Sequence, residues 1–275
     1  MRFMVGIDVG GTFTDFVAYD RETKEIDVWK HLSVPANPVD GILAGMASFA
    51  HRGEIANIRL GTTVATNALV ERKGATIAYV TTKGFRDVIF IQRGNRKFHY
   101  DMSWVKPKPL ALRRHCFEVV ERLDASGNVL TPLDEDSVRE VARRIADDPD
   151  VTAVAVMLLF SYLNPVHEHR VKAIFAKEAP RLADSTSYDV LPKWKEYERA
   201  STTLADAYLK PLVSRQLRHM RERFAQEGVT EHVVVIKSNG GEMTLEAAAE
   251  RPVEILVSGP TGGVVASKYI ARLLG

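Results

Sequence analysis

The chain of 275 residues is long enough for one large domain or two modest ones, and its composition (45% hydrophobic, 26% charged) is that of an ordinary globular protein. Its formal net charge of +2 gives no reason to expect nucleic-acid or membrane binding, and the single cysteine, Cys116, excludes a disulfide framework or a multi-cysteine metal site. No apolar run approaches the roughly 20 residues of a membrane span, and the short N-terminal apolar stretch is interrupted by Asp8, unlike a secretory signal. We therefore expect a cytoplasmic protein.

The first 80 residues predict a mixed sheet with helical crossovers. Residues 3–9 alternate apolar and polar side chains and, with FVAYD and IDVWKHLS, predict a three-stranded antiparallel meander. A helix is expected from Asn37 to about Ala50, because Pro38 suits a first turn and apolar residues recur at helical spacing. Next come a strand, loop and helix in IRLGTTVATNAL, ending by Gly74, and another strand in ATIAYVTT.

The rest of the chain predicts further α/β structure. Residues 84–133 are basic, aromatic and interrupted by prolines, which indicates a long excursion with short strands and a hairpin turn at 126–128. We expect helices over 134–146 and 164–179 and, between them, a strand in VTAVAVMLLF that is buried on both faces. After them we expect a strand in STSYDVL, a helix over 195–227 with a possible break at Pro211, a strand in HVVVIKSNGG, a helix over 245–249, a strand and loop in VEILVSGPTGG, and a last helix.

The stretch DVGGTFTD, residues 8–15, is the first candidate site. Its glycine pair allows a sharp turn and a close approach of the backbone to a ligand, and successive N–H groups in such a turn can bind an anion. Thr12 and Thr14 add hydroxyl donors, and Asp8 at the strand end can hold a hydrated Mg²⁺ beside phosphates. The alternative is a tight hairpin in which Asp and Thr only stabilise the turn.

Three more polar loops follow predicted strands. They are GTTVATNAL at 61–69, SNGGEMT at 238–244 and SGPTGG at 258–263. Ligands of open α/β sheets gather at the carboxyl ends of strands, and backbone N–H groups at a strand-to-helix junction favour anions. A helix start capped by Thr66 or Asn67 is the simpler interpretation of the first of the three.

Other polar clusters have structural interpretations. His167 and His169 lie two apart on a predicted helix, about 200° around its axis, so they are poorly placed to share a metal ion and instead suggest an exposed helix start. The hydroxyls of YERASTT, 197–203, pack against a neighbour or line a cleft. The basic residues of the excursion form a solvated face or meet an anionic substrate or partner: Arg86, Arg93, Arg96 and Lys97.

Together, these motifs resemble the hydantoinase A / oxoprolinase family, which includes N-methylhydantoinase subunits and the acetone carboxylase β subunit. The matching stretches span nearly the whole chain: GIDVGGTFTDFV, GTTVATNALVERKGA, VTTKGFRDV, SYLNPVHEHRV, YERASTTLADAYL, SNGGEMT and SGPTGGVVAS. One position departs from the pattern, because Leu60 stands where family members typically have a histidine before the GTT loop.

The resemblance implies an RNase H-like, actin-like ATPase fold, a mixed α/β sheet with helices on both faces, that binds ATP and Mg²⁺. It implies catalytic roles for Asp8 and Asp15, with Asp8 near the metal through water, and phosphate or cofactor contacts from Gly10, Gly11, Thr12, Thr14, Gly259, Gly262 and Gly263. Substrate contacts are expected from Thr62, Thr63, Thr66, Asn67, Asn239 and Gly240. The expected domains are an N-terminal domain over 1–182, with the excursion at about 84–133, and the beginning of an ATPase domain over 183–275.

The same resemblance implies an ATP-dependent hydrolase or carboxylase subunit. In this scheme, ATP phosphorylates the carbonyl or enol oxygen of a hydantoin, 5-oxoproline or ketone, and a hydantoinase B-like partner completes the reaction, without nucleic acid or membrane. The alternatives are a small-molecule kinase of the same superfamily and a chaperone-like reactivating ATPase. The family's second DxGGT loop does not occur in this sequence, so we expect an N-terminal portion that binds ATP weakly by itself.

Overall fold

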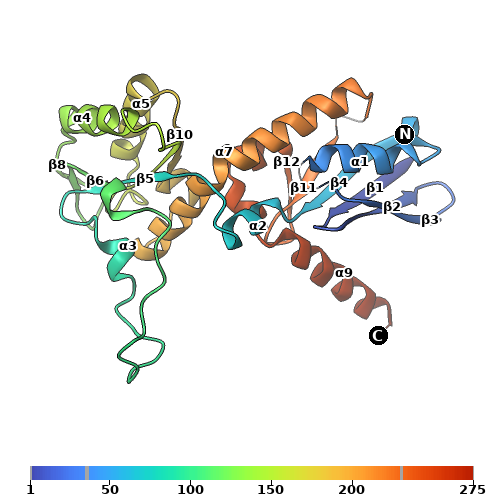
Figure 1. Cartoon of the computed structure of the whole chain (residues 1–275), viewed down its shortest axis with the longest axis horizontal. Helices are drawn as coiled ribbons and strands as arrows, with labels where there is room; N and C mark the ends of the chain where they lie inside the picture. The colour runs from blue at the N-terminus through green and yellow to red at the C-terminus, as the bar shows by residue number, and fades with distance from the viewer. Residues whose placement is uncertain (1, 35–36, 230–231, 275) are drawn as a thin grey trace. The chain divides into compact units, whose positions relative to one another are not determined.

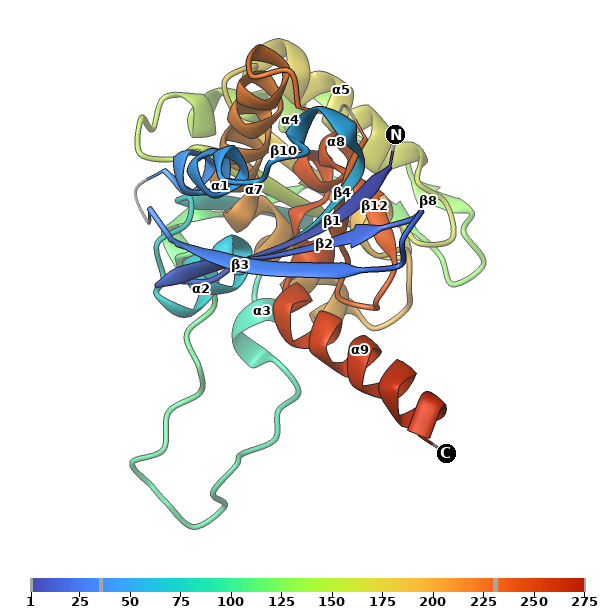
Figure 2. The same ribbon diagram turned by 90° about the vertical axis from the view of Figure 1, so that its right-hand side faces the viewer.

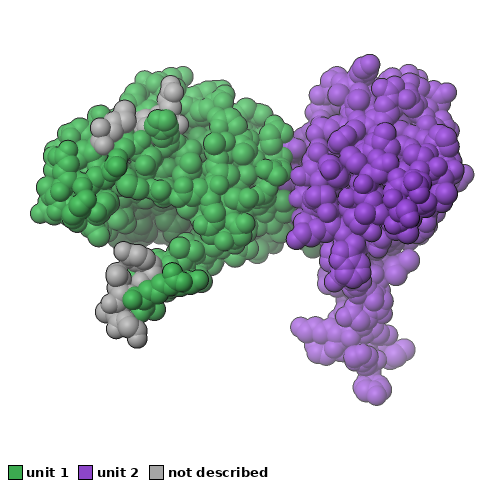
Figure 3. All heavy atoms as spheres, turned by 180° about the vertical axis from the view of Figure 1, so that it is seen from behind, with its two compact units in different colours: residues 1–73, 212–275 green, residues 74–211 purple. Residues whose placement is uncertain are grey.

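The computed structural model describes residues 2–34, 37–229 and 232–274, which form two compact units (Figures 1 and 3). Unit 1 comprises residues 1–73 and 212–275, and unit 2 comprises residues 74–211. The chain therefore leaves unit 1 after Lys73 and returns to it within the long helix α7, Glu196–Gln226, which continues through Pro211. These units divide the chain differently from the sequence-based ranges 1–182 and 183–275, because strands from residues 1–73 and from residues 212–275 share one sheet.

Unit 1 is built on a six-stranded mixed sheet in the order β12-β11-β4-β1-β2-β3. The predicted meander is confirmed: β1–β2 and β2–β3 pair antiparallel, whereas β4 is parallel to both β1 and β11 (Figure 2). Residues of β1 alternate between buried and more accessible positions. Neighbouring side chains at the end of this strand therefore point to opposite faces of the sheet. The strands are β1 (Phe3–Val9), β2 (Phe13–Asp20), β3 (Ile26–Leu32), β4 (Ile55–Thr62), β11 (Val233–Ile236) and β12 (Glu242–Thr244).

Helix α1 covers the meander through an aromatic cluster. The ring of Trp29 lies between those of Phe16 and Phe49, with centroids 5.1 Å away on each side. Gly45 of α1 allows this approach, because a Cβ there would lie 2.3 Å from Phe16. The helical segments of unit 1, besides the C-terminal part of α7, are α1 (Pro38–Ala47), η1 (Arg52–Glu54), α2 (Val64–Val70), α8 (Leu245–Glu250), η3 (Pro252–Ile255) and α9 (Ser258–Leu274).

Unit 2 contains a parallel sheet in the order β10-β9-β5-β6. Every residue of β9 is buried, which confirms the strand predicted to be covered on both faces. The strands are β5 (Ile77–Thr82), β6 (Cys116–Val119), β9 (Ala153–Met157) and β10 (Ala183–Thr186), with β7 (Arg122–Leu123) and β8 (Val129–Thr131) forming the predicted hairpin. The helical segments are α3 (Val88–Ile91), η2 (Arg113–His115), α4 (Glu135–Ala146), α5 (Val166–Glu178), α6 (Ser187–Val190) and the N-terminal part of α7.

Three local predictions are wrong. VEILV is not a strand: it contains the short 3-10 helix η3 and then Val257, a β-branched residue in a left-handed conformation (φ 61°). SGPTGG is not a loop but the beginning of α9, since a proline is tolerated in a first turn where its missing N–H has no partner to lose. STSYDVL changes from strand to helix at Ser187, where Thr186 accepts a hydrogen bond from Asp189 N (3.4 Å).

Candidate functional site

The turn between β1 and β2 places two carboxylates side by side. Asp8 and Asp15 are directly opposite in the antiparallel register, so their side chains lie on the same face of the sheet. The turn is closed by Gly10 N, which donates to Phe13 O at 3.0 Å. A Cβ at Gly10 would lie only 2.8 Å from that oxygen, so this tight geometry requires glycine. Gly11 and Thr12, at the tip, are exposed.

Thr14 lies on the opposite face from the two carboxylates. It is fully buried, and its hydroxyl is 3.0 Å from Ser33 Oγ, which donates to Gly10 O at 2.8 Å. Its side chain thus fixes the glycine turn from behind. Because this hydroxyl is buried on the other face of the sheet, it does not reach the face that carries Asp8.

The Asp8 carboxylate is crowded by its own strand neighbours. Gly61 on β4 lies beside it, and a Cβ at Gly61 would come within 2.9 Å of Asp8 Oδ1. Partial burial, and then the charge of Asp15, raise the pKa of Asp8 above its ordinary value. A cation between the two carboxylates would offset that repulsion, so these oxygen donors fit Mg²⁺. Within the described residues no three potential ligands cluster, so water or phosphate oxygens would have to complete the coordination shell.

The second loop follows β4 and is bonded to the end of β1. Thr63 Oγ1 donates to Val9 O at 3.3 Å and accepts from Asn67 Nδ2 at 3.3 Å. Neither Thr66 nor Asn67 caps the helix, because α2 begins at Val64 and both residues lie within it. Thr66 instead accepts a hydrogen bond from Val257 N at 3.0 Å, so the loop is joined to the start of α9.

The third and fourth loops are joined to each other and to the second. Ser258 Oγ donates to Thr62 O at 3.0 Å, and Thr261 Oγ1 donates to Ser238 O at 3.1 Å. Gly240 has φ +85°, and a Cβ there would lie 3.1 Å from Val265. Asn239 accepts from Gly241 N at 3.0 Å, so its amide oxygen shapes the loop.

The first turn of α9 lies beside the second loop. A Cβ at Gly259 would be 3.7 Å from the Thr63 methyl group, while one at Gly262 or Gly263 would have nothing within 4 Å. Val257 just before the helix has a backbone conformation that costs of order 1–3 kcal/mol for a β-branched residue. Strain of this kind, next to helix N–H groups without intrahelical acceptors, is frequent at ligand-binding positions.

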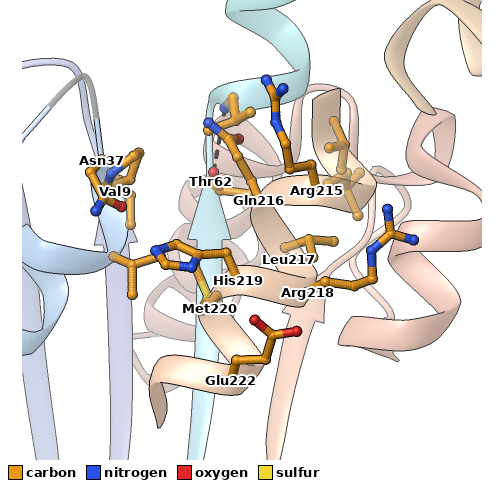
Figure 4. Close-up of a pocket in the computed structure, with 15 residues that line it drawn as sticks. Val9, Asn37, Thr62, Arg215, Gln216, Leu217, Arg218, His219, Met220 and Glu222 are labelled. Carbon is orange, nitrogen blue, oxygen red and sulfur yellow. Dashed lines mark hydrogen bonds between the residues drawn. The ribbon is translucent and has the colours of Figure 1, made fainter. Parts of the chain in front are cut away.

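A pocket of about 560 Å³ lies at the ends of β1 and β4, on the face opposite Asp8. Its lining includes the inward-facing Val9 and Thr62, and Gln216 and His219 extend from α7 toward these strand ends (Figure 4). Because neighbouring residues of a strand point to opposite faces, the pocket and the carboxylates are on two sides of the sheet. Of the residues predicted for substrate binding, the pocket contains only Thr62.

Unit 2 contains a buried polar cluster at the carboxyl end of its sheet, which the sequence did not predict. His167 and Glu168 are buried, so the expectation of an exposed helix start is wrong: the first turn of α5 packs under the end of β9. His167 Nδ1 lies 2.7 Å from Glu121 Oε2. Glu168 accepts from Leu158 N (2.9 Å), Ser187 Oγ (2.6 Å) and Tyr188 N (2.8 Å).

The same cluster includes Arg199, whose side chain is fully buried. It donates to Leu158 O at 2.7 Å, so Leu158 is held through its N–H by Glu168 and through its carbonyl by Arg199. Burial raises the pKa of Glu168, and the hydrogen bonds donated to its carboxylate oppose that shift. In the YERASTT stretch, Thr202 and Thr203 donate to carbonyls one turn back in α7, and the complete burial of Thr203 favours the packing interpretation.

The side chain of Cys116, the one cysteine of the sequence, is buried in unit 2. Burial raises the pKa of the Cys116 thiol to about 11, so very little nucleophilic thiolate is present near neutral pH. Among residues 2–34, 37–229 and 232–274, no helix combines the length and the apolarity that crossing a bilayer needs.

Two family models match the chain: the hydantoinase/oxoprolinase N-terminal region over residues 4–179 and hydantoinase/oxoprolinase over residues 199–275. The chain belongs to the hydantoinase/oxoprolinase family. Among curated relatives, an uncharacterized protein of Methanocaldococcus jannaschii is 39% identical over 278 residues, and caprolactamase subunit alpha of Pseudomonas jessenii is 32% identical over 289 residues. Each alignment covers 100% of this chain and 41% of the relative.

Solved structures confirm the α/β fold class expected for this hydantoinase/oxoprolinase chain. The nucleotide-free structure of acetone carboxylase matches with a TM-score of 0.89 at 28% identity, over 100% of this chain and 41% of that one. The crystal structure of ATP-dependent caprolactamase from P. jessenii matches with a TM-score of 0.87 at 29% identity, over 99% and 41%. The described chain thus corresponds to less than half the length of the proteins it resembles.

Proposed function

We propose that this hydantoinase/oxoprolinase chain carries one phosphate-binding half of an ATP-dependent enzyme that activates a cyclic amide or ketone by phosphorylating its oxygen. Relatives named as a caprolactamase and acetone carboxylase support the substrate class, and both solved relatives are titled as ATP-dependent. The domain ranges 1–182 and 183–275 are part of the proposal, supported by the two family-model matches on either side of residue 182.

One observation carries the proposal: four polar loops, far apart in the sequence, are joined in unit 1 by hydrogen bonds. Thr63 reaches the end of β1, Ser258 reaches Thr62, and Thr261 reaches Ser238. These bonds place the glycine turn, the α2 junction and the start of α9 around neighbouring strand ends. Such strand ends are where open α/β sheets bind their ligands.

The residues divide into different roles in this proposal. Asp8 and Asp15 would hold a hydrated Mg²⁺, which would neutralise phosphate charge during phosphoryl transfer. Backbone N–H groups of Gly11 and Thr12 would contact phosphate oxygens, while Gly10 would close the turn through its bond to Phe13 O and Thr14 would position the turn from behind. The first turn of α9 would offer ATP further N–H groups, among them that of Gly259, while Gly262 and Gly263, beyond that turn, would leave open space beside the helix for the nucleotide.

The substrate would be bound on the side of unit 1 that carries the second and third loops. The predicted contacts are those expected from the family resemblance: Thr62, Thr63, Thr66, Asn67, Asn239 and Gly240. Thr62, Thr63 and Thr66 are already bonded to neighbouring segments, so we assign them to positioning, and Asn239 and Gly240, on the accessible third loop, to direct contact. A second, hydantoinase B-like subunit would complete hydrolysis or carboxylation; the relative named as subunit alpha of caprolactamase supports an enzyme with more than one subunit.

The test is ATP hydrolysis by the complete enzyme with its partner, with Mg²⁺, against hydantoin, 5-oxoproline, ε-caprolactam, acetone and acetophenone. We expect one of these to stimulate ATP hydrolysis at least tenfold. Asp8→Asn should reduce the stimulated rate by about 100-fold or more without changing the melting temperature, because it removes charge stabilisation from the transition state.

Two results would contradict the proposal. A stable phosphorylated small molecule formed without any partner would indicate a kinase. ATP hydrolysis that responds to a protein partner but to none of the five compounds would indicate a reactivating ATPase.

A further inference from the structure

Unit 2 carries a long loop that extends away from its sheet. Residues 94–108, here called the arm, lie between α3 and η2, and Figures 1 and 2 show them as a single extended excursion below α3. Figure 3 shows the same segment as a projection from unit 2. Loops of this length without secondary structure are uncommon in compact domains and usually functional.

The arm has a defined conformation. At its base, Gln92 Nε2 donates to Pro107 O at 2.8 Å and Lys106 Nζ donates to Ile91 O at 2.5 Å. Arg93, immediately before the arm, forms a bidentate pair with Glu198 of α7, with Nε 2.6 Å from Oε1. Contacts on both the outgoing and the returning segment of the loop therefore fix the base of the arm to the rest of unit 2.

The tip of the arm is also ordered by internal hydrogen bonds. Asp101 Oδ1 accepts from Ser103 N (2.9 Å) and Ser103 Oγ (2.6 Å), and Asp101 O accepts from Arg96 at 2.6 Å. The guanidinium of Arg96 lies 5.7 Å from the centroid of the Trp104 ring. An arm that is already folded in this way loses little conformational entropy when it binds.

Large apolar side chains on the arm point into solvent. Tyr100 is 99% exposed, Met102 88% and Val105 76%, and Phe98 is also exposed. Aromatic residues, Met and Arg are the types enriched in protein interfaces, and the arm combines them. It carries four basic residues, Arg96, Lys97, Lys106 and Lys108, against the single acidic residue Asp101, so its surface is positive.

We propose that the arm docks onto the hydantoinase B-like subunit, at an acidic surface with an apolar pocket that takes Tyr100 and Met102. The positive charge of the arm calls for an acidic partner surface, its composition is that of a protein interface, and the relative named as one subunit of caprolactamase supports a second subunit as the occupant. This inference rests on the proposed function, because that function supplies the partner. Tyr100 and Met102 are the anchors, and the basic residues orient the encounter.

The experiment uses the complete chain co-expressed with its hydantoinase B-like subunit. Tyr100→Asp combined with Met102→Asp should raise the dissociation constant of the complex at least about tenfold, since buried anchors dominate binding energy. Lys97→Glu should weaken binding less and mainly slow association at low salt. Matched controls on the same unit are Leu130→Asp, another exposed apolar residue, and Lys177→Glu on α5, which should bind like wild type.

A photo-crosslinker identifies what the arm touches. With Tyr100 replaced by p-benzoylphenylalanine, we expect crosslinked peptides from the partner subunit, next to Asp and Glu residues. Crosslinks only to a second copy or to another segment of the same chain would overturn the inference.

The remaining outcomes separate this inference from the proposed function. A stable complex whose affinity the arm variants leave unchanged would overturn the arm as docking surface while leaving the proposed function intact. No complex between the wild-type subunits would contradict the partner in the proposed function and the inference together.

Discussion

Asp8 in unit 1 and Glu168 in unit 2 are both carboxylates at the carboxyl edge of a sheet, yet their surroundings differ. Asp8 is accessible to solvent but partly covered by its strand neighbours, it faces Asp15, and no hydrogen bond to its side chain is seen among the described contacts. Glu168 is completely buried and accepts three hydrogen bonds from the ends of β9 and α6. For both groups burial raises the pKa, but only Asp8 keeps oxygens available to a ligand.

This difference separates two uses of a charged group. A buried carboxylate with its bonding capacity filled holds segments together, and its removal leaves donors without acceptors. An exposed carboxylate beside a like charge contributes little to stability and is suited to binding a cation. The comparison therefore predicts opposite consequences when the surroundings of the two groups are changed.

The largest expected effect is on stability, from Glu168→Ala. It leaves Leu158 N, Tyr188 N and the Ser187 hydroxyl without their acceptor, and we expect a loss of about 3 kcal/mol in the free energy of unfolding. Denaturant titration measures it, with Ser187→Ala as a milder comparison at about 1 kcal/mol. If the variant kept its stability but lost ATP turnover, Glu168 would belong to the functional site, and its contrast with Asp8 would be wrong.

A medium effect is expected on activity, from Gly61→Ala. The added methyl group would lie 2.9 Å from Asp8 Oδ1 and displace the carboxylate, and we expect turnover of ATP to fall about tenfold because catalysis is sensitive to displacements of this size. Stability should stay the same, which the melting temperature checks. Gly53→Ala is the control, since a Cβ there has nothing within 4 Å. Equal activity of the two variants would show that the position of Asp8 is unimportant.

The smallest effect tests a third carboxylate, Asp20 at the end of β2. Hydrogen bonds from Arg2, together with those from Glu22 N and Thr23 N, hold its pKa well below the ordinary value of 3.8. With a depressed pKa in the folded state, the stabilisation is fully present above about pH 4 and is lost as the pH falls below it. Asp20→Asn should flatten the pH dependence of the unfolding free energy below pH 4. An unchanged slope would exclude Asp20 as the titrating group.

Local sequence patterns determined much of the secondary structure in both units. The meander, the helix after Asn37 and the buried strand β9 were predicted correctly, because alternation and helical spacing depend only on neighbouring residues. The sequence also predicted that polar loops follow the strands, and thereby which residues form the candidate site. Their roles stay predictions, since a loop sequence does not say which group faces a ligand.

Tertiary structure alone decided which of these residues meet and which are buried. From the sequence, Thr14 was expected to donate to phosphate. It lies behind the turn, because strand alternation puts its side chain on the other face of the sheet from Asp8. From the sequence, His167 and Glu168 were expected at an exposed helix start, yet both are buried, His167 against Glu121 and Glu168 at the ends of β9 and α6. SGPTGG begins a helix whose first turn is bonded to loops more than 20 residues away. Burial depends on what packs against a segment, and that information lies elsewhere in the chain.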